Sequence, residues 1–444
     1  MYKNEWNILE KIQPMLVGEQ VKNKLKRQPS YEESIRTESQ AVRLMELNKI
    51  NSFYLPSDMS VEIYTKLYLA MVRSMQKKES KLVIQQRNIN GKNMRACANG
   101  FEPSFGGIIA GTDSFSVIGN SGIGKSSAIS KAVQLMGGED VIEMDNPYCK
   151  LIPVINVQCP FDCSVKSMLL AILQKIDVAL GTSYYTMAVK SKANINTMLI
   201  STAQILLNHV AILCIDEIQN LIKHRAGIQL VSMMTELLNE SGISIVFVGT
   251  PEVEPFFESV DYLARRTLGF HYDRCRYDTY FREFCAQLWE FQYVQKKQKI
   301  SDDVIYWLYQ HSAGTMSHIL FLFQTAQEIS ILNGREILDM QALESAYQRM
   351  RMLHIHIQPD MNLKKVASKK KKSDTDKRVE KIIQKKEKVD NTAPITDDVI
   401  IQYPVNKGSV EEWTFLDLAN KAKKKQTDIV SLLYGKISIT EVSV

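Results

Sequence analysis

Eight consecutive residues, Gly119–Ser126, have the types and the spacing that hold a triphosphate. They read GNSGIGKS and match the pattern G-x-x-x-x-G-K-S. Glycines let the backbone turn its amide groups toward phosphate oxygens, and a following helix adds the favourable end of its dipole. Lys125 would reach the β- and γ-phosphates of ATP, and the Ser126 hydroxyl would ligate Mg²⁺. The predicted nucleotide-binding residues are Gly119, Asn120, Ser121, Gly122, Ile123, Gly124, Lys125, Ser126 and Ser127.

Two adjacent carboxylates follow an apolar run further along the chain. Ala211–Ile215 leads directly into Asp216 and Glu217. At the end of a buried strand, Asp216 can bind Mg²⁺ together with Ser126 of the loop. Glu217 can activate the attacking water as a general base. The pattern is common alone, but downstream of a phosphate-binding loop it predicts an ATPase.

Two further positions could complete the chemistry. Thr250 follows the apolar run Ile243–Val248, where AAA+ ATPases place a polar residue that senses the γ-phosphate. Arg265 and Arg266 lie in a connection between a helix and a strand, and one of the two guanidiniums, with Arg266 slightly favoured over Arg265, could reach the γ-phosphate of a neighbouring subunit. The alternative interpretation is a surface arginine pair packed against the next strand.

The elements that must position these residues alternate between strands and helices. Strands separated by helices imply right-handed crossovers and a parallel sheet. The predicted fold class is therefore α/β, and the nucleotide motifs resemble those of an AAA+ P-loop NTPase, here with a small helical lid, an N-terminal extension and a basic C-terminal tail. An amphipathic helix is predicted at Ser60–Met75. The predicted strands are Phe115–Ile118, Leu151–Val157, Ala211–Ile215, Ile243–Val248 and Phe270–Arg276.

Charge and composition suggest five regions along the 444 residues. The net charge of +6 is unevenly distributed: residues 101–363 are acidic overall, whereas 1–100 and 364–388 are basic. DNA contact is therefore expected from the flanks or from a local patch. The predicted regions are an N-terminal partner or DNA-interaction region (1–100), a nucleotide-binding core (101–279), a helical lid (280–360), a lysine-rich linker expected to be disordered (361–395) and a C-terminal docking segment (396–444).

Other site classes find little support. Seven scattered cysteines do not suggest a disulfide framework, and the spacing in CPFDC does not suit a metal pair. No apolar run is long enough to span a bilayer, and the N-terminal residues do not resemble a secretory signal. We expect a cytoplasmic protein that does not bind membranes.

The motifs together resemble those of the TnsC/TniB family, over about residues 100–350 and more loosely before that. The stretches that carry the resemblance, in order, are VIGNSGIGKSS, LGTSYYTM, CIDEIQNL, FVGTPEVEPFFE, LARRTLGF and SDDVIYWLYQHSAGTMSHILFLFQTAQ. The family comprises bacterial AAA+ regulators that connect target-site selection to the transposase in TnsABC-type transposons. One departure from many AAA+ lids is that Gly314–His318 contains no arginine or lysine, which suggests slow turnover.

The resemblance implies a switch with several partners. ATP-bound subunits would assemble on duplex DNA as a ring or filament, each completing its neighbour's site, and hydrolysis would dismantle the assembly. A target-selection protein and transposase subunits would be further partners. The family also suggests DNA-facing elements within Gly181–Thr197, which makes Lys190 and Lys192 candidate phosphate contacts. A solvated loop with two ordinary lysines is the alternative interpretation.

Two other functions are compatible with the same nucleotide chemistry. An AAA+ replication initiator or helicase loader would also assemble on DNA, but such proteins commonly carry a DNA-binding domain after the lid. Here a lysine run and a short tail follow residue 350. A signalling NTPase would oligomerise on a protein ligand without touching DNA.

Overall fold

The structure is a computed structural model. It describes residues 8–78, 80, 83–85, 114–138, 140–145, 148–191, 193–224, 226–258 and 269–353. The chain divides into two compact units, Met1–Met361 and Asn362–Val444. The linker at 361–395 and the docking segment at 396–444 lie outside the described residues, so these two predictions stay predictions.

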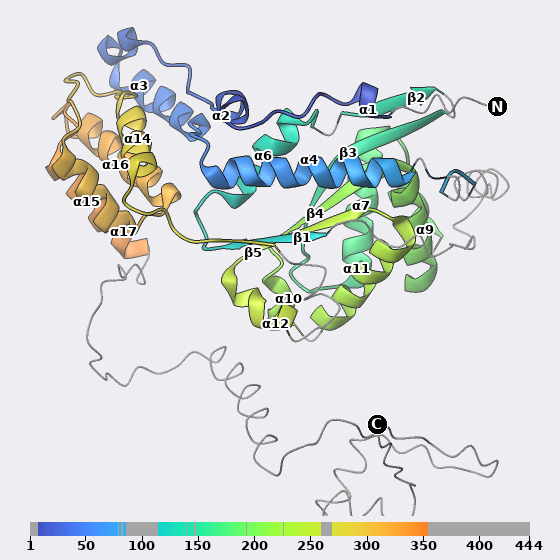
Figure 1. The fold of residues 1–444 in the computed structure, drawn as a ribbon. Helices are drawn as coiled ribbons and strands as arrows, with labels where there is room; N and C mark the ends of the chain where they lie inside the picture. Colours follow the sequence, from blue (N-terminus) through green and yellow to red (C-terminus); the bar gives the residue numbers. More distant parts are fainter. Residues whose placement is uncertain are drawn as a thin grey trace, which may run out of the picture. The chain divides into compact units, whose positions relative to one another are not determined.

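A six-stranded sheet forms the centre of the first unit, in the order β2-β3-β4-β5-β1-β6 (Figure 1). Every neighbouring pair is parallel except β2 and β3, which are antiparallel. The predicted fold class is thereby confirmed, and β2 is an additional strand. The bounds are β1 Phe115–Gly119, β2 Ile142–Asp145, β3 Tyr148–Gln158, β4 Val210–Asp216, β5 Ser244–Gly249 and β6 Phe270–Tyr272.

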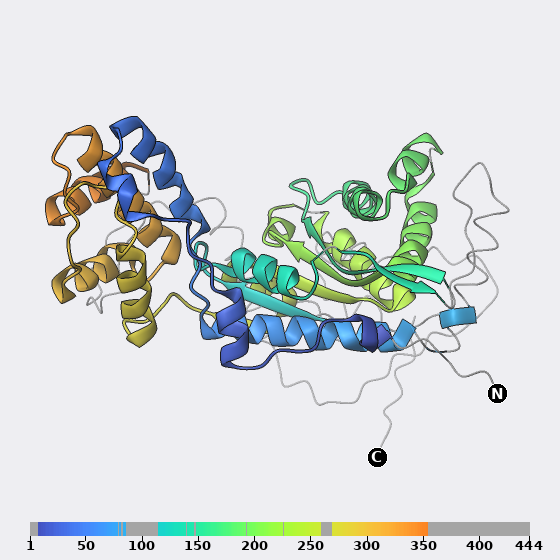
Figure 2. The same ribbon diagram turned by 90° about the horizontal axis from the view of Figure 1, so that it is seen from above.

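The central strands are buried on both faces, as their continuous apolar runs require. All residues of β1 and β5 are buried, and in β4 only the last residue, Asp216, is partly exposed. One face packs against α7 (Val165–Leu180), α9 (Ile195–His209) and α11 (Gly227–Ser241). The opposite face packs against α4 (Asp58–Lys78) and α6 (Lys125–Leu135), as Figure 2 shows.

The N-terminal region contributes directly to this core. The predicted helix at Ser60–Met75 corresponds to α4, and its apolar side, including Ile63, Leu67 and Met71, is fully buried against the sheet and α6. The shorter helices α1 (Ile8–Lys11) and α2 (Glu19–Leu25) lie along α4. A partner-binding role for residues 1–100 is therefore restricted to what this packing leaves exposed.

Four helices follow the sheet and form the lid: α14 (Thr279–Trp289), α15 (Asp302–Ser312), α16 (Met316–Leu332) and α17 (Met340–Leu353). Asp278 and Ser301 cap α14 and α15 by accepting hydrogen bonds from backbone amides. The lid core also includes Leu47, Ile50 and Phe53 from the N-terminal region, which come from α3 (Gln40–Leu47), the 3-10 turn at Asn48–Ser52 and the residue after it.

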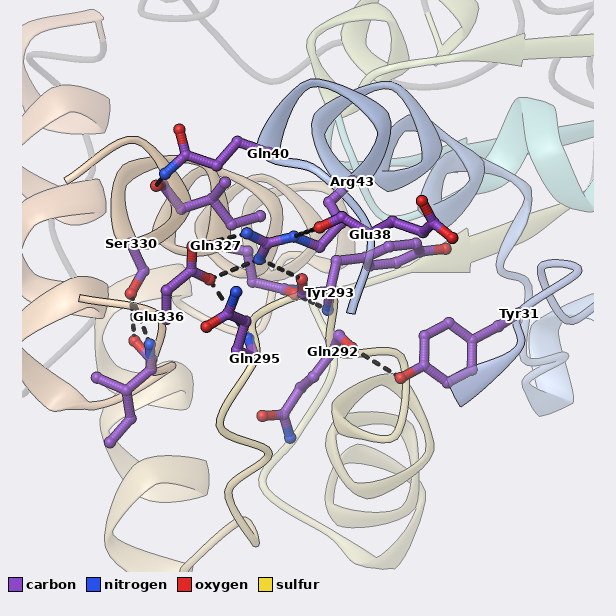
Figure 3. A network of polar contacts seen from close by, with 12 residues as sticks. Tyr31, Glu38, Gln40, Arg43, Gln292, Tyr293, Gln295, Gln327, Ser330 and Glu336 are labelled. Carbon is purple, nitrogen blue, oxygen red and sulfur yellow. Dashed lines mark hydrogen bonds and ion pairs between the residues drawn. The ribbon is translucent and has the colours of Figure 1, made fainter. Parts of the chain in front are cut away.

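A buried ion pair joins α3 to the lid (Figure 3). The Arg43 guanidinium, 1% exposed, forms two parallel hydrogen bonds with the Glu336 carboxylate, at 2.5 and 2.7 Å. It also donates to the carbonyls of Tyr293 and Glu38, each at 3.0 Å. The hydrogen bond from Arg43 holds the pKa of Glu336 below its usual value of 4.5. The N-terminal segment therefore connects the lid to the sheet-packing helix α4.

Candidate functional site

The carboxyl ends of β1, β5 and β4 lie side by side because these strands are neighbours in the sheet. The phosphate-binding loop follows β1, Asp216 ends β4, and Thr250 follows β5. Ligands of open parallel sheets bind beyond the carboxyl ends of the strands. The sheet order thus brings together site residues from three separate parts of the sequence.

Glycine is required in the loop for conformational and steric reasons. Gly122 and Gly124 have φ of +79° and +99°, a region that L side chains rarely adopt. A Cβ at Gly122 would also lie 2.3 Å from the Ser317 hydroxyl at the start of α16. The Ser317 amide donates to the Gly122 carbonyl at 3.1 Å, so the lid begins in direct contact with the loop.

Lys125 is the first residue of α6, and its ammonium lies in the mouth of the loop. It donates to the carbonyls of Gly119 and Asn120 at 2.6 and 2.9 Å. The side chain is 8% exposed, and burial lowers its pKa, opposed by the negative charges of Asp216 and Glu217. A buried cation surrounded by loop carbonyls and facing two carboxylates is well placed to bind phosphate oxygens.

Ser126 and Asp216, the two predicted magnesium ligands, are close together. The Ser126 hydroxyl donates to the Asp216 carboxylate at 2.7 Å, across 90 residues of sequence. Hydroxyl and carboxylate oxygens are the donors that Mg²⁺ prefers, and it commonly takes one or two of them with nucleotide and water oxygens. The described residues contain no cluster of three or more His, Cys, Asp or Glu side chains suited to a metal. The donor set fits an ion shared with a nucleotide.

Glu217 occupies an unusual backbone conformation directly beyond Asp216. Its φ of +60° lies in the left-handed region, which non-glycine residues enter at a cost. Its amide donates to Asp216 at 2.8 Å, and the amide of the next residue, Ile218, donates to the carbonyl of Val248 in β5 at 3.1 Å. This turn ties the end of β4 to β5. The Glu217 carboxylate accepts a hydrogen bond from Gln219 Nε2.

Thr250 follows the last residue of β5 and also borders the site. Its hydroxyl oxygen is buried and has no hydrogen-bond partner in the described structure. Buried polar groups are normally satisfied, so an unpaired hydroxyl at this position suggests a ligand contact.

A cavity of about 380 Å³ is lined by residues 121–127 of the loop and by Asp216, Glu217 and Thr250, whereas Gly119 and Asn120 do not line it. Most of the other residues that line this cavity come from the N-terminal region and from the lid, and the sequence did not predict them. An adjacent cavity of about 500 Å³ shares several of the same residues. The only feature of the sequence that could have indicated these lining residues is the apolar content of Phe53–Leu55 and of the lid helices. The missed lining residues include Phe53, Tyr54, Leu55, Tyr280, Phe284, Met316 and Leu320.

Three predicted site residues, Arg265, Arg266 and Lys192, lie outside the described residues. Lys190 is exposed and ends the short helix α8 (Tyr184–Lys190), which lies within the stretch Gly181–Thr197 where DNA-facing elements are expected. The Asp177 carboxylate of α7 accepts from the amides of Tyr184 and Tyr185, both at 2.8 Å, and so fixes the start of α8. Lys190 does not line the cavity that contains the phosphate-binding loop.

No described helix has the length and apolarity needed to cross a membrane.

Residues 110–275 match the family model described as "Bacterial TniB protein", which confirms the family resemblance. No curated protein matches the chain. Solved structures similar to it include the Aeropyrum pernix ORC1 protein in complex with DNA, with 17% identity, a TM-score of 0.41, and coverage of 54% of this chain and 60% of that one. The Aeropyrum pernix ORC2 protein (ADPNP–ADP complexes) has 16% identity and a TM-score of 0.37, with coverage of 54% of this chain and 62% of that one. Drosophila ORC bound to DNA has 13% identity and a TM-score of 0.36, with coverage of 60% of each chain.

Proposed function

We propose that this chain, whose residues 110–275 form an AAA+ ATPase region of the TniB type, is an ATP-dependent regulator of DNA transposition. It would assemble on duplex DNA and link target-site selection to the transposase. The observation that carries the proposal is the meeting of Lys125, Ser126, Asp216, Glu217 and Thr250 at adjacent strand ends, within the region of family similarity.

Each residue of the site has a distinct role in ATP hydrolysis. Lys125 and the loop amides bind the phosphates, while Ser126 and Asp216 would hold Mg²⁺, which when bound would neutralise phosphate charge. Glu217 accepts a proton from the attacking water, and the Thr250 hydroxyl donates to the γ-phosphate. The aromatic and apolar residues of the cavity, such as Tyr280 and Phe284, would receive the base.

Self-association would complete the site. Among the described residues, the cations that line the cavity are Lys125 and Lys131, both on α6. Phosphoryl transfer gains strongly from an arginine that stabilises transition-state charge. We propose that Arg266 or Arg265 of an adjacent copy supplies it, so that ATP binding favours a ring or filament.

Contact with DNA is assigned to Lys190, the last residue of α8, and to Lys192 beyond it. Lys190 is exposed there, and Lys192 is two residues further on. Lysine contacts to phosphates are independent of sequence, which suits a protein that coats DNA. The exposed parts of residues 1–100 would receive the target-selection protein, and residues 396–444 would contact the transposase.

A pull-down on immobilised duplex DNA, with a non-hydrolysable ATP analogue and without nucleotide, tests the proposal. Retention that depends on the analogue supports it, whereas assembly that ignores DNA would favour the signalling NTPase. To separate it from a replication initiator or helicase loader, the same beads are incubated with transposase subunits and, in parallel, with a replicative helicase. Nucleotide-dependent capture of the helicase alone would contradict our proposal.

A further inference from the structure

Gln219 makes an interaction with the general base that the nucleotide motifs do not explain. It lies two residues after Glu217, and its Nε2 donates to Oε2 of the Glu217 carboxylate. The backbone of Glu217 itself is in the left-handed region, two residues before Gln219. An amide donor that occupies one carboxylate oxygen leaves the other, Oε1, to accept a proton.

The other end of the Gln219 amide is unpaired. Its Oε1 is buried and has no hydrogen-bond partner in the described structure, which is also true of the Thr250 hydroxyl. Both residues line the cavity that contains the phosphate-binding loop. Two orphaned polar atoms beside the general base suggest that a polar ligand, such as a water molecule next to the γ-phosphate, satisfies them.

The neighbouring backbone leaves room for this arrangement. A Cβ on Gly249, the last residue of β5, would lie 3.0 Å from Gln219 Oε1 and 2.6 Å from Cγ1 of Ile218. Because Gly249 has no side chain, the Gln219 amide packs directly against the end of β5, beside Thr250. The amide therefore lies between the end of β4, which Glu217 follows, and the end of β5, which Thr250 follows.

We propose that Gln219 is a positioning residue that orients both Glu217 and the attacking water. Its Nε2 holds Glu217 Oε2, and its Oε1 accepts one hydrogen of the water while Glu217 Oε1 accepts the other as a proton. The water oxygen bonds to the γ-phosphorus, the bond from that phosphorus to the β,γ-bridging oxygen breaks, and ADP leaves with the electron pair. The inference rests on the proposed function, since it concerns hydrolysis at the same site.

The test is steady-state ATPase kinetics of Gln219→Met, which keeps the approximate shape of the side chain and removes both hydrogen-bonding ends. Loss of positioning is expected to lower kcat by about ten- to a hundredfold, because small misplacements of reacting groups carry costs of that order. The Kd for ATP should stay within about twofold of wild type, because Gln219 is assigned no ground-state contact with the phosphates. The matched control is Gln348→Met on α17, where Gln348 donates to Glu344 at 2.8 Å in an exposed pair. Its kcat should not change.

A double variant distinguishes positioning from packing. If Gln219 and Glu217 act as a unit on one attacking water, then Glu217→Gln/Gln219→Met should be no slower than Glu217→Gln alone, since residues that act as a unit are not additive. Losses that multiply, or a Gln219→Met enzyme with kcat within twofold of wild type, overturn the inference. A wild-type chain that binds ATP but never hydrolyses it, with or without DNA, contradicts the proposed function instead.

Discussion

At the nucleotide site, three residues with positive φ shape the backbone around the phosphates: Gly122 and Gly124 in the loop, and Glu217 after β4. The phosphate-binding loop and the pair Asp216–Glu217 follow from local rules, because each needs particular residue types at fixed spacing next to a strand. Gln219 could not be found in this way. Its contact with Glu217 depends on the left-handed backbone of Glu217, and its packing against β5 depends on Gly249 having no side chain. Both features are visible only in three dimensions.

Lys125→Ala should weaken ATP binding by about a hundredfold or more. It removes the only ammonium in the mouth of the loop, as far as the described residues show, and charge-assisted contacts to phosphate are among the stronger hydrogen bonds. Isothermal titration with a non-hydrolysable analogue measures the change. Lys131→Ala, which removes a charge from the same helix, is the control and should change Kd by less than about fivefold. Equal losses in the two variants would contradict the role of Lys125.

At the scale of elements, the apolar pattern predicted which helix faces are buried but not their partners. The helix at Ser60–Met75 was recognised by its spacing, yet nothing in that pattern showed that it packs on the central sheet. The short strand β2 was missed because IEMD is only half apolar. Strand β6 ends at Tyr272, before the predicted Arg276, because it pairs with only three residues of β1.

The ion pair between Arg43 and Glu336 allows a test of how α3 is held against the lid. Arg43→Met should lower the free energy of unfolding by about 3–5 kcal/mol, because it leaves the buried Glu336 carboxylate unpaired. Arg43→Met/Glu336→Leu should recover most of that loss, since apolar replacements of a buried pair are often neutral. Urea unfolding measures both. A double variant as unstable as the single one would show that packing, not the unpaired charge, causes the loss.

The DNA-binding assignment of α8 is tested by the salt dependence of affinity. Lys190→Ala should weaken binding to duplexes of different sequence by similar factors and reduce the slope of log K against log salt by about 1 for each phosphate that the side chain no longer neutralises. Fluorescence anisotropy over a salt series measures both quantities. Lys299→Ala, an exposed lysine of the lid, is the control. If Lys190→Ala has the affinity and the slope of wild type, α8 does not contact the phosphates.

At the scale of the whole molecule, we propose that nucleotide binding is coupled to self-association on DNA. Glu217→Gln should keep ATP bound while hydrolysis falls by about 10²–10⁴-fold, which holds the assembly in its ATP state. Lys125→Ala should not reach that state. Both variants change a residue that lines the same cavity. A difference in assembly between them therefore reflects whether ATP is bound, and not a general loss of folding.

The most direct test is the mass of the particles that Glu217→Gln forms with ATP and a defined duplex, measured by mass photometry or negative-stain imaging. We predict rings or filaments on the DNA with ATP, far fewer without nucleotide, and monomers for Lys125→Ala under every condition. If Glu217→Gln binds ATP but remains a monomer on the duplex, or assembles equally without nucleotide, the central claim is contradicted.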